Sequence, residues 1–177
     1  MEKFIKISDR ISQGTGIIAG FMMILALVMV LVEIVLRTFF SKTLYITEEY
    51  TAYLMVGITF IGLAYTLKEK GHIRMSFLQT VLRDKARMYL EIYALIVGLI
   101  FFTLITYTTT NFFWDSVVSQ SRSMSITSTY LAIPQFFMPL GSLIMTLQFI
   151  AEIMRTIVKL RSGEIDSDDV ETKALGR

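Results

Sequence analysis

The 177-residue sequence has no cysteine, one histidine, two prolines and only 18% charged residues. The lack of cysteine excludes thiol catalysis, disulfide exchange and iron–sulfur ligation. A haem-bearing membrane anchor typically needs several histidines, and this chain has only His72, so that class is excluded. Soluble domains carry about 25% charged residues, whereas 54% of this chain is hydrophobic. We therefore predict a membrane protein, and the net charge of +2 gives no indication of nucleic-acid binding.

Four long apolar stretches can each cross a bilayer. A helix rises about 1.5 Å per residue, so about 20 residues cross a hydrocarbon core of roughly 30 Å. In lipid the backbone amides must bond within the segment, so helices are expected. The predicted fold class is all-α integral membrane, with one domain over residues 14–161 and spans at about 14–36, 48–68, 88–114 and 134–157.

The basic residues are unevenly divided between the two sides of these spans. The segments before the first span, between the second and third, and after the fourth together contain fourteen Lys and Arg residues. The other two loops contain three, Arg122 among them. Because cytoplasmic segments are enriched in Lys and Arg, both termini are predicted to be cytoplasmic.

Two connecting segments have amphipathic patterns. In residues 1–13 one helical face is apolar and another is basic, which predicts a helix in the cytoplasmic interface. A second surface helix is expected after Gly71, and the acidic tail at 162–177 is expected to be disordered. The faces of the first segment consist of Phe4, Ile7 and Ile11 on one side and Lys3, Lys6 and Arg10 on the other.

Glu33 is the most membrane-embedded carboxylate. An ionisable group within a span is a functional candidate by default, but Arg37 follows one turn later and an i,i+4 ion pair is available. A structural pair or partner contact is favoured, and ion or proton coupling remains the alternative. The pair Glu48 and Glu49 opens the second span after Thr47, a predicted N-cap, where carboxylates complement the helix dipole.

Other marked residues have structural interpretations. Gly16 and Gly20 form a GxxxG pattern that permits close helix approach. Pro139 is expected either in the first turn of the fourth span or at a kink. The threonines of the third span are expected to bond to their own backbone or to a neighbouring helix. The sequence contains no phosphate loop, nucleophile motif or metal-ligand cluster, so no catalytic, cofactor or metal site is predicted.

Several of these features occur in a characteristic order. An acidic pair opens span two, the sequence GHIRMSFL follows that span, a basic cluster precedes span three, and IPQFFMPLGSLIM opens span four. This order resembles the small membrane subunit of tripartite ATP-independent periplasmic (TRAP) transporters, the DctQ-like family, over residues 5–160. The residues that carry the resemblance are Glu48, Glu49, Gly71, His72, Ile73, Arg74, Pro134, Pro139 and Gly141.

The resemblance implies a non-enzymatic, multi-pass subunit of the bacterial inner membrane. Such subunits bind a large membrane subunit that moves sodium and an organic anion, such as sialic acid or a C4-dicarboxylate, by an elevator-type motion. A periplasmic binding protein delivers the substrate. The small subunit would act as a scaffold in contact with lipid, and His72 and Arg74 would set the turn after span two.

A free-standing four-helix multidrug-type exporter is the alternative. Such exporters also have a glutamate in the first span, but they are shorter, place it at mid-span and often have a weak charge bias. A quinone-linked disulfide-oxidising enzyme also has four helices but needs cysteines, and this sequence has none.

Overall fold

The computed structural model describes residues 2–69 and 84–162, and almost all of them are helical. Four of its helices are long and apolar enough to cross a membrane, which confirms the all-α membrane fold. The described residues form no β-strand beyond one isolated bridge, between Arg122 and Tyr130. The helices are α1 (Glu2–Phe40), α2 (Tyr45–Lys68), α4 (Asp84–Val118), α5 (Ala132–Gln135) and α6 (Phe137–Ser162).

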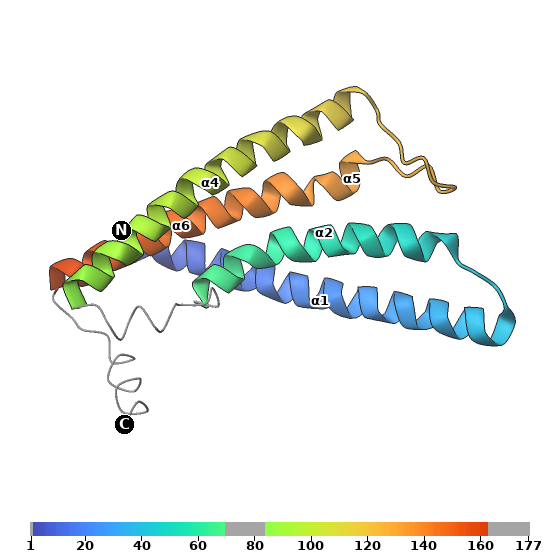
Figure 1. Cartoon of the computed structure of the whole chain (residues 1–177), viewed down its shortest axis with the longest axis horizontal. Helices are drawn as coiled ribbons and strands as arrows, with labels where there is room; N and C mark the ends of the chain where they lie inside the picture. The colour runs from blue at the N-terminus through green and yellow to red at the C-terminus, as the bar shows by residue number, and fades with distance from the viewer. Residues whose placement is uncertain (1, 70–83, 163–177) are drawn as a thin grey trace.

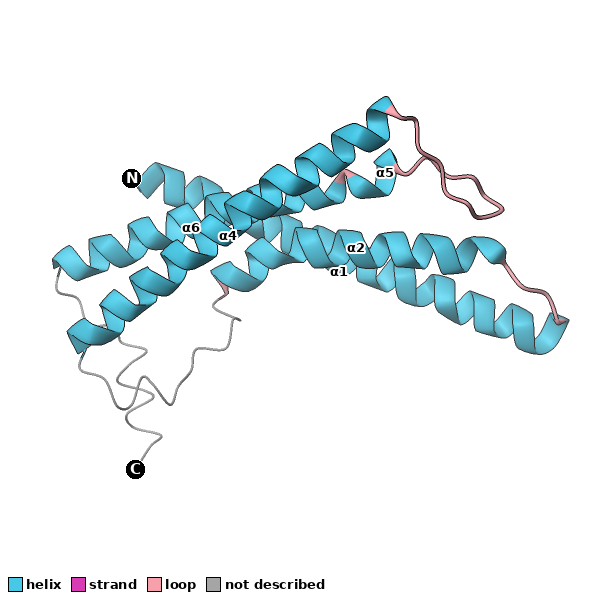
Figure 2. Ribbon diagram, turned by 45° about the horizontal axis from the view of Figure 1, so that its top comes forward, coloured by secondary structure: helices cyan, strands magenta, loops and turns pink. Residues whose placement is uncertain are grey.

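The helices form two hairpins that pack through α6. Helix α6 packs against α4 on one side and against α2 on the other, while α1 packs on α2 and crosses α6 (Figures 1 and 2). The pairs α1–α2 and α4–α6 diverge toward the end that carries the α1–α2 turn (Figure 1). The fold is therefore an open layer of helices, and α4 packs mainly on α6 and α5.

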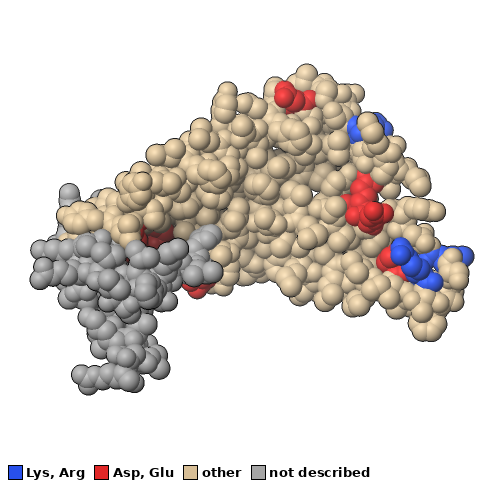
Figure 3. Space-filling view, in the orientation of Figure 1, with Lys and Arg blue, Asp and Glu red and all other residues tan. Residues whose placement is uncertain are grey.

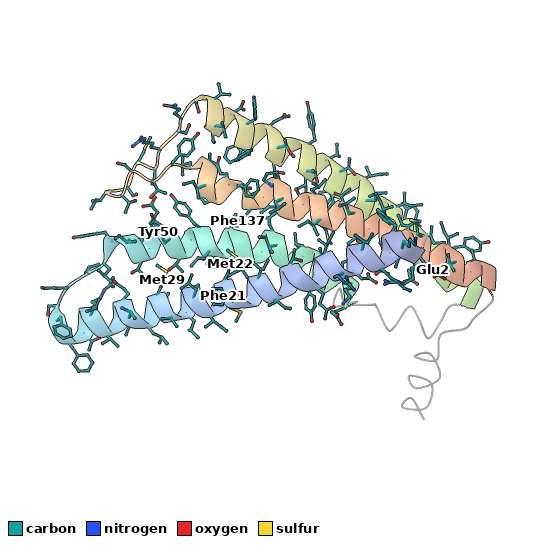
Figure 4. All side chains as sticks on the ribbon, turned by 180° about the vertical axis from the view of Figure 1, so that it is seen from behind. Glu2, Phe21, Met22, Met29, Tyr50 and Phe137 are labelled. Carbon is teal, nitrogen blue, oxygen red and sulfur yellow. The ribbon has the colours of Figure 1, made fainter. Side chains whose placement is uncertain are left out.

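Small residues allow the helices to pack closely. A Cβ on Gly57 of α2 would lie 2.3 Å from Met22 of α1 and 3.6 Å from Phe137 of α6, so three helices meet there. Met22 is almost fully buried, whereas its neighbour Phe21 is 68% exposed (Figure 4). The main hydrophobic cluster joins α2 to α6 and consists of Ala64, Leu67, Met145 and Phe149.

Charged residues are confined to the ends of the helices on the face seen in Figure 3. A broad uncharged band covers the middle of that face, and acidic and basic side chains gather near the α1–α2 turn and the loop at 119–131. This distribution fits helices whose middle sections lie in hydrocarbon.

Two sequence expectations change on the structure, and others fall on residues that the structure does not describe. The prediction that Thr47 is the N-cap of α2 is wrong: the cap position is Leu44, which has no side-chain cap bond of its own. Residues 2–13 continue into the first span within one helix, α1, so they are not a separate element. The predicted surface helix after Gly71, the signature 71–74 and the tail from 163 lie outside the described residues.

Candidate functional site

Glu33 joins the first two helices at one end of the bundle. The residue is only 8% exposed, and its Oε1 accepts a hydrogen bond from Arg37 Nη2 at 3.1 Å. Its Oε2 accepts one from the backbone N–H of Leu44 at 2.9 Å, and Thr47 Oγ1 lies 3.5 Å away. Leu44 occupies the N-cap position of α2, so a carboxylate from α1 caps the neighbouring helix.

Glu49 fastens the 119–131 loop to α2. Its Oε1 accepts a hydrogen bond from Tyr53 at 2.5 Å, and its Oε2 accepts hydroxyl protons from Ser125 and Thr127. From the sequence, the helix dipole was expected to explain the position of Glu49. The structure shows that Glu49 also has specific hydrogen-bond partners in the loop. Glu48, the other member of the acidic pair, is exposed.

Pro134, Pro139 and Gly141 shape the entry of the fourth span. Each proline is the third residue of its helix, where the backbone nitrogen has no acceptor within that same helix. A Cβ on Gly141 would lie 2.3 Å from the carbonyl oxygen of Phe60, which is backbone and cannot swing aside. Glycine at 141 is thus required for the close approach of α2 and α6.

The two glycines of the GxxxG pattern differ. A Cβ on Gly16 would meet the ring of Tyr65 at 2.4 Å, so this glycine makes room for α2. Gly20 has nothing within 4 Å of the same position and faces outward. Only the first glycine serves packing within the chain.

A buried polar cluster between α1 and α6 was not predicted. Gln148 is fully buried, and its amide oxygen accepts hydrogen bonds from Ser8 at 2.7 Å and Ser12 at 2.8 Å. Its nitrogen donates to Asp9 Oδ1 at 3.1 Å and Glu152 Oε1 at 3.3 Å. The amide thus uses its full hydrogen-bonding capacity, two bonds accepted and two donated.

Arg155 completes this cluster. Its guanidinium donates to Asp9 Oδ2 and to Glu152 Oε1, each at 2.5 Å. The spacing of Gln148, Glu152 and Arg155 places all three on one face of α6, and that pattern was available in the sequence. Their partners on α1 could not be identified, because Ser8, Asp9 and Ser12 give no apolar signal.

The threonines of α4 bond to their own backbone, and two of them also reach α6. Thr106 and Thr109 lie 3.2 and 3.3 Å from hydroxyls of α6, on Thr146 and Ser142 respectively. The exposed Thr103 donates to the carbonyl of Leu99, four residues earlier. Thr106 and Thr109 likewise donate to carbonyls four residues earlier, so both outcomes expected from the sequence occur, and in these two threonines they occur together.

Within the described residues, the buried charged side chains are Glu33 and Glu152, and both bond to neighbouring groups. No group of three or more metal-ligating side chains occurs in the same part of the chain. The geometry is that of helix-positioning contacts at the two ends of an apolar layer.

The sequence was compared with models of known protein families. Residues 26–159 match the family described as "Tripartite ATP-independent periplasmic transporters, DctQ component". The chain belongs to the DctQ family. This membership confirms the resemblance drawn from the sequence and identifies the chain as a membrane component of a TRAP transporter. A search of curated proteins finds no match.

The DctQ match begins part-way along α1, so it covers the second half of the first predicted span and the whole of the other three. It therefore includes Glu33, Glu49, Gln148 and Gly141. Residues 3–10, at the start of α1, precede the matched region. A component of a tripartite transporter works with a large membrane subunit and a binding protein, so partners of this kind are implied.

Proposed function

We propose that this DctQ-family chain is a scaffold for the large, sodium-coupled, elevator-type subunit of a transporter that imports organic anions such as sialic acid or C4-dicarboxylates. The chain lies in the bacterial inner membrane with both termini in the cytoplasm. It contributes no step of substrate or sodium movement. The periplasmic binding protein meets the assembled complex transiently.

The observation that carries this proposal is the openness of the helix layer. Of the 18 consecutive residues that form the most apolar part of α4, none is buried. In the corresponding 18 residues of α1, only 17% are buried. These faces are lined by large apolar side chains, so they suit lipid or another transmembrane helix. The most exposed on α4 include Tyr93, Ile100, Phe101, Leu104 and Tyr107.

The arrangement of polar groups also supports a scaffold. An organic anion needs positive or donor groups along its route, but the exposed threonines of α4 bond to their own backbone. Arg155, at the other end of the bundle, is occupied by two carboxylates. A free-standing exporter would need an available charged group near mid-span, and Glu33 caps α2 at one end instead.

Reconstitution into liposomes tests the proposal. We expect substrate uptake only when this chain, the large subunit, the binding protein and a sodium gradient are all present. We also expect the chain to co-purify with the large subunit when the two are expressed together. Uptake by this chain alone would disprove the scaffold role and favour the exporter.

A further inference from the structure

The first turns of α1 are held in a defined rotation against α6. Ser8 and Ser12 are 5% and 0% exposed, and both donate to the buried amide of Gln148. Asp9 is bonded to Gln148 and Arg155 on the same side. Because these contacts define the inward face of the helix, they also determine which residues face outward.

Three cations occupy the outward face. At about 100° per residue, Lys3, Lys6 and Arg10 fall within roughly 60° of one another and about 170° from the mean direction of Ser8 and Ser12. All three are exposed. We call Lys3, Lys6 and Arg10 the basic stripe.

Among the described residues, no side chain forms an ion pair with the basic stripe. Glu2, in the first turn of α1, is adjacent to Lys3 but does not pair with the stripe, and Asp9 is already occupied by Arg155 and Gln148. An apolar strip lies beside the stripe and consists of Phe4, Ile7 and Ile11, which are 38%, 59% and 42% exposed. Cations beside an exposed apolar strip are the features of a helix at the membrane interface.

The basic stripe is long enough to span the headgroup layer. Lys3 and Arg10 are separated by seven residues, about 10 Å along the axis, whereas the headgroup layer is roughly 5–7 Å thick on each side of the hydrocarbon. The charged cluster of Asp9, Glu152 and Arg155 lies at the same level, since Asp9 belongs to this stretch of α1 and bonds to Arg155, which also bonds to Glu152. Such a cluster marks the edge of the apolar region.

We propose that the basic stripe of α1 binds anionic phospholipid headgroups of the leaflet that this end of the helix reaches. The phosphates accept charge-assisted hydrogen bonds from the three cations while the apolar strip enters the acyl boundary. The polar cluster around Gln148 presents the stripe by fixing the rotation of α1. Lipid binding by the basic stripe does not depend on transport. A negative result for lipid binding would therefore leave the scaffold role standing, and the reverse also holds.

Quenching by brominated lipids tests the proposal on the full chain. Trp114 is the only tryptophan, so F4W in a W114F background places one reporter beside the stripe. Vesicles of phosphatidylcholine contain the same fraction of brominated phosphatidylglycerol or brominated phosphatidylcholine. We expect the anionic lipid to quench Trp fluorescence roughly twofold more, because each basic residue near the surface attracts acidic lipid.

Variants separate the stripe from the overall charge of the protein. K3Q/K6Q/R10Q should remove the preference, the single K6Q should reduce it, and K3R/K6R should retain it. K42Q/R122Q removes two cations near the opposite end of the helices and should leave the preference unchanged. Equal quenching by the two lipids in the parent chain, or an equal loss in K42Q/R122Q, would overturn the proposal.

Discussion

At the scale of single residues, Glu33 shows how one carboxylate can serve two helices. It neutralises Arg37 on its own helix and accepts the backbone N–H of Leu44 at the start of α2. An ionised group in an apolar region is costly unless it is paired and hydrogen-bonded. Both conditions are met here, so the residue has a structural reason to be where it is.

Replacing Glu33 with glutamine should therefore reduce stability without changing ion coupling. The loss of a charge-assisted cap and an ion pair should lower the free energy of unfolding by about 1–3 kcal/mol. Thermal denaturation of the purified complex measures this, with the exposed Glu48→Gln as the matched control. If Glu33→Gln abolished the sodium dependence of uptake in an intact complex, the structural assignment would be wrong.

Gly141 and Gly20 give a second contrast between residues of one type. A Cβ at position 141 collides with the backbone of Phe60, so Gly141→Ala requires α2 and α6 to separate. We expect a loss of stability of about 1–3 kcal/mol from this overpacking. Gly20→Ala meets nothing within 4 Å and should instead be neutral or stabilise α1 by up to about 1 kcal/mol. Equal melting temperatures for the two variants would contradict the close approach.

At the scale of elements, Gln148 determines how α1 is rotated against α6. Its amide bonds to Ser8, Ser12 and Asp9 on one helix and to Glu152 on its own. Satisfied buried networks specify a single packing arrangement, because any other register leaves polar atoms without partners. The apolar faces around it would tolerate several registers.

Gln148→Leu keeps a similar volume and removes all four bonds. We expect a loss of stability of about 2 kcal/mol, since buried groups of α1 and α6 lose their partners. Thermal denaturation in detergent measures the change. Asn111→Leu, at an exposed amide of α4, is the control and should stay within about 0.5 kcal/mol of the parent. A stable Gln148→Leu variant would show that apolar packing alone sets the α1–α6 contact.

At the scale of the whole molecule, orientation is decided by charge. Fourteen of the seventeen Lys and Arg residues lie in segments assigned to one side. Reporter enzymes test this: a cytoplasm-active reporter fused to the C-terminus and a periplasm-active reporter inserted near Arg122 should both be active. Activity of the periplasmic reporter at the C-terminus would refute the orientation.

The four spans and the helical class followed from the sequence, because length and apolarity are local properties that any membrane helix must have. The family followed from the order of short motifs along the chain. Charge asymmetry likewise gave an orientation without reference to contacts. The first three predicted spans lie within α1, α2 and α4, and the fourth begins in α5 and continues through Phe136 into α6.

Tertiary structure alone decided which side chains meet. The sequence could offer Glu33 a partner at i+4, but not the backbone of Leu44 eleven residues on, nor could it bring Ser125 and Thr127 to Glu49. It also gave no sign that Ser8 and Ser12 face Gln148, well over a hundred residues away. In a chain whose helices are apolar on most faces, hydrophobicity does not distinguish the face that packs from the face that meets lipid. The choice rests on small residues and polar bonds between helices, which exist only once the helices are side by side.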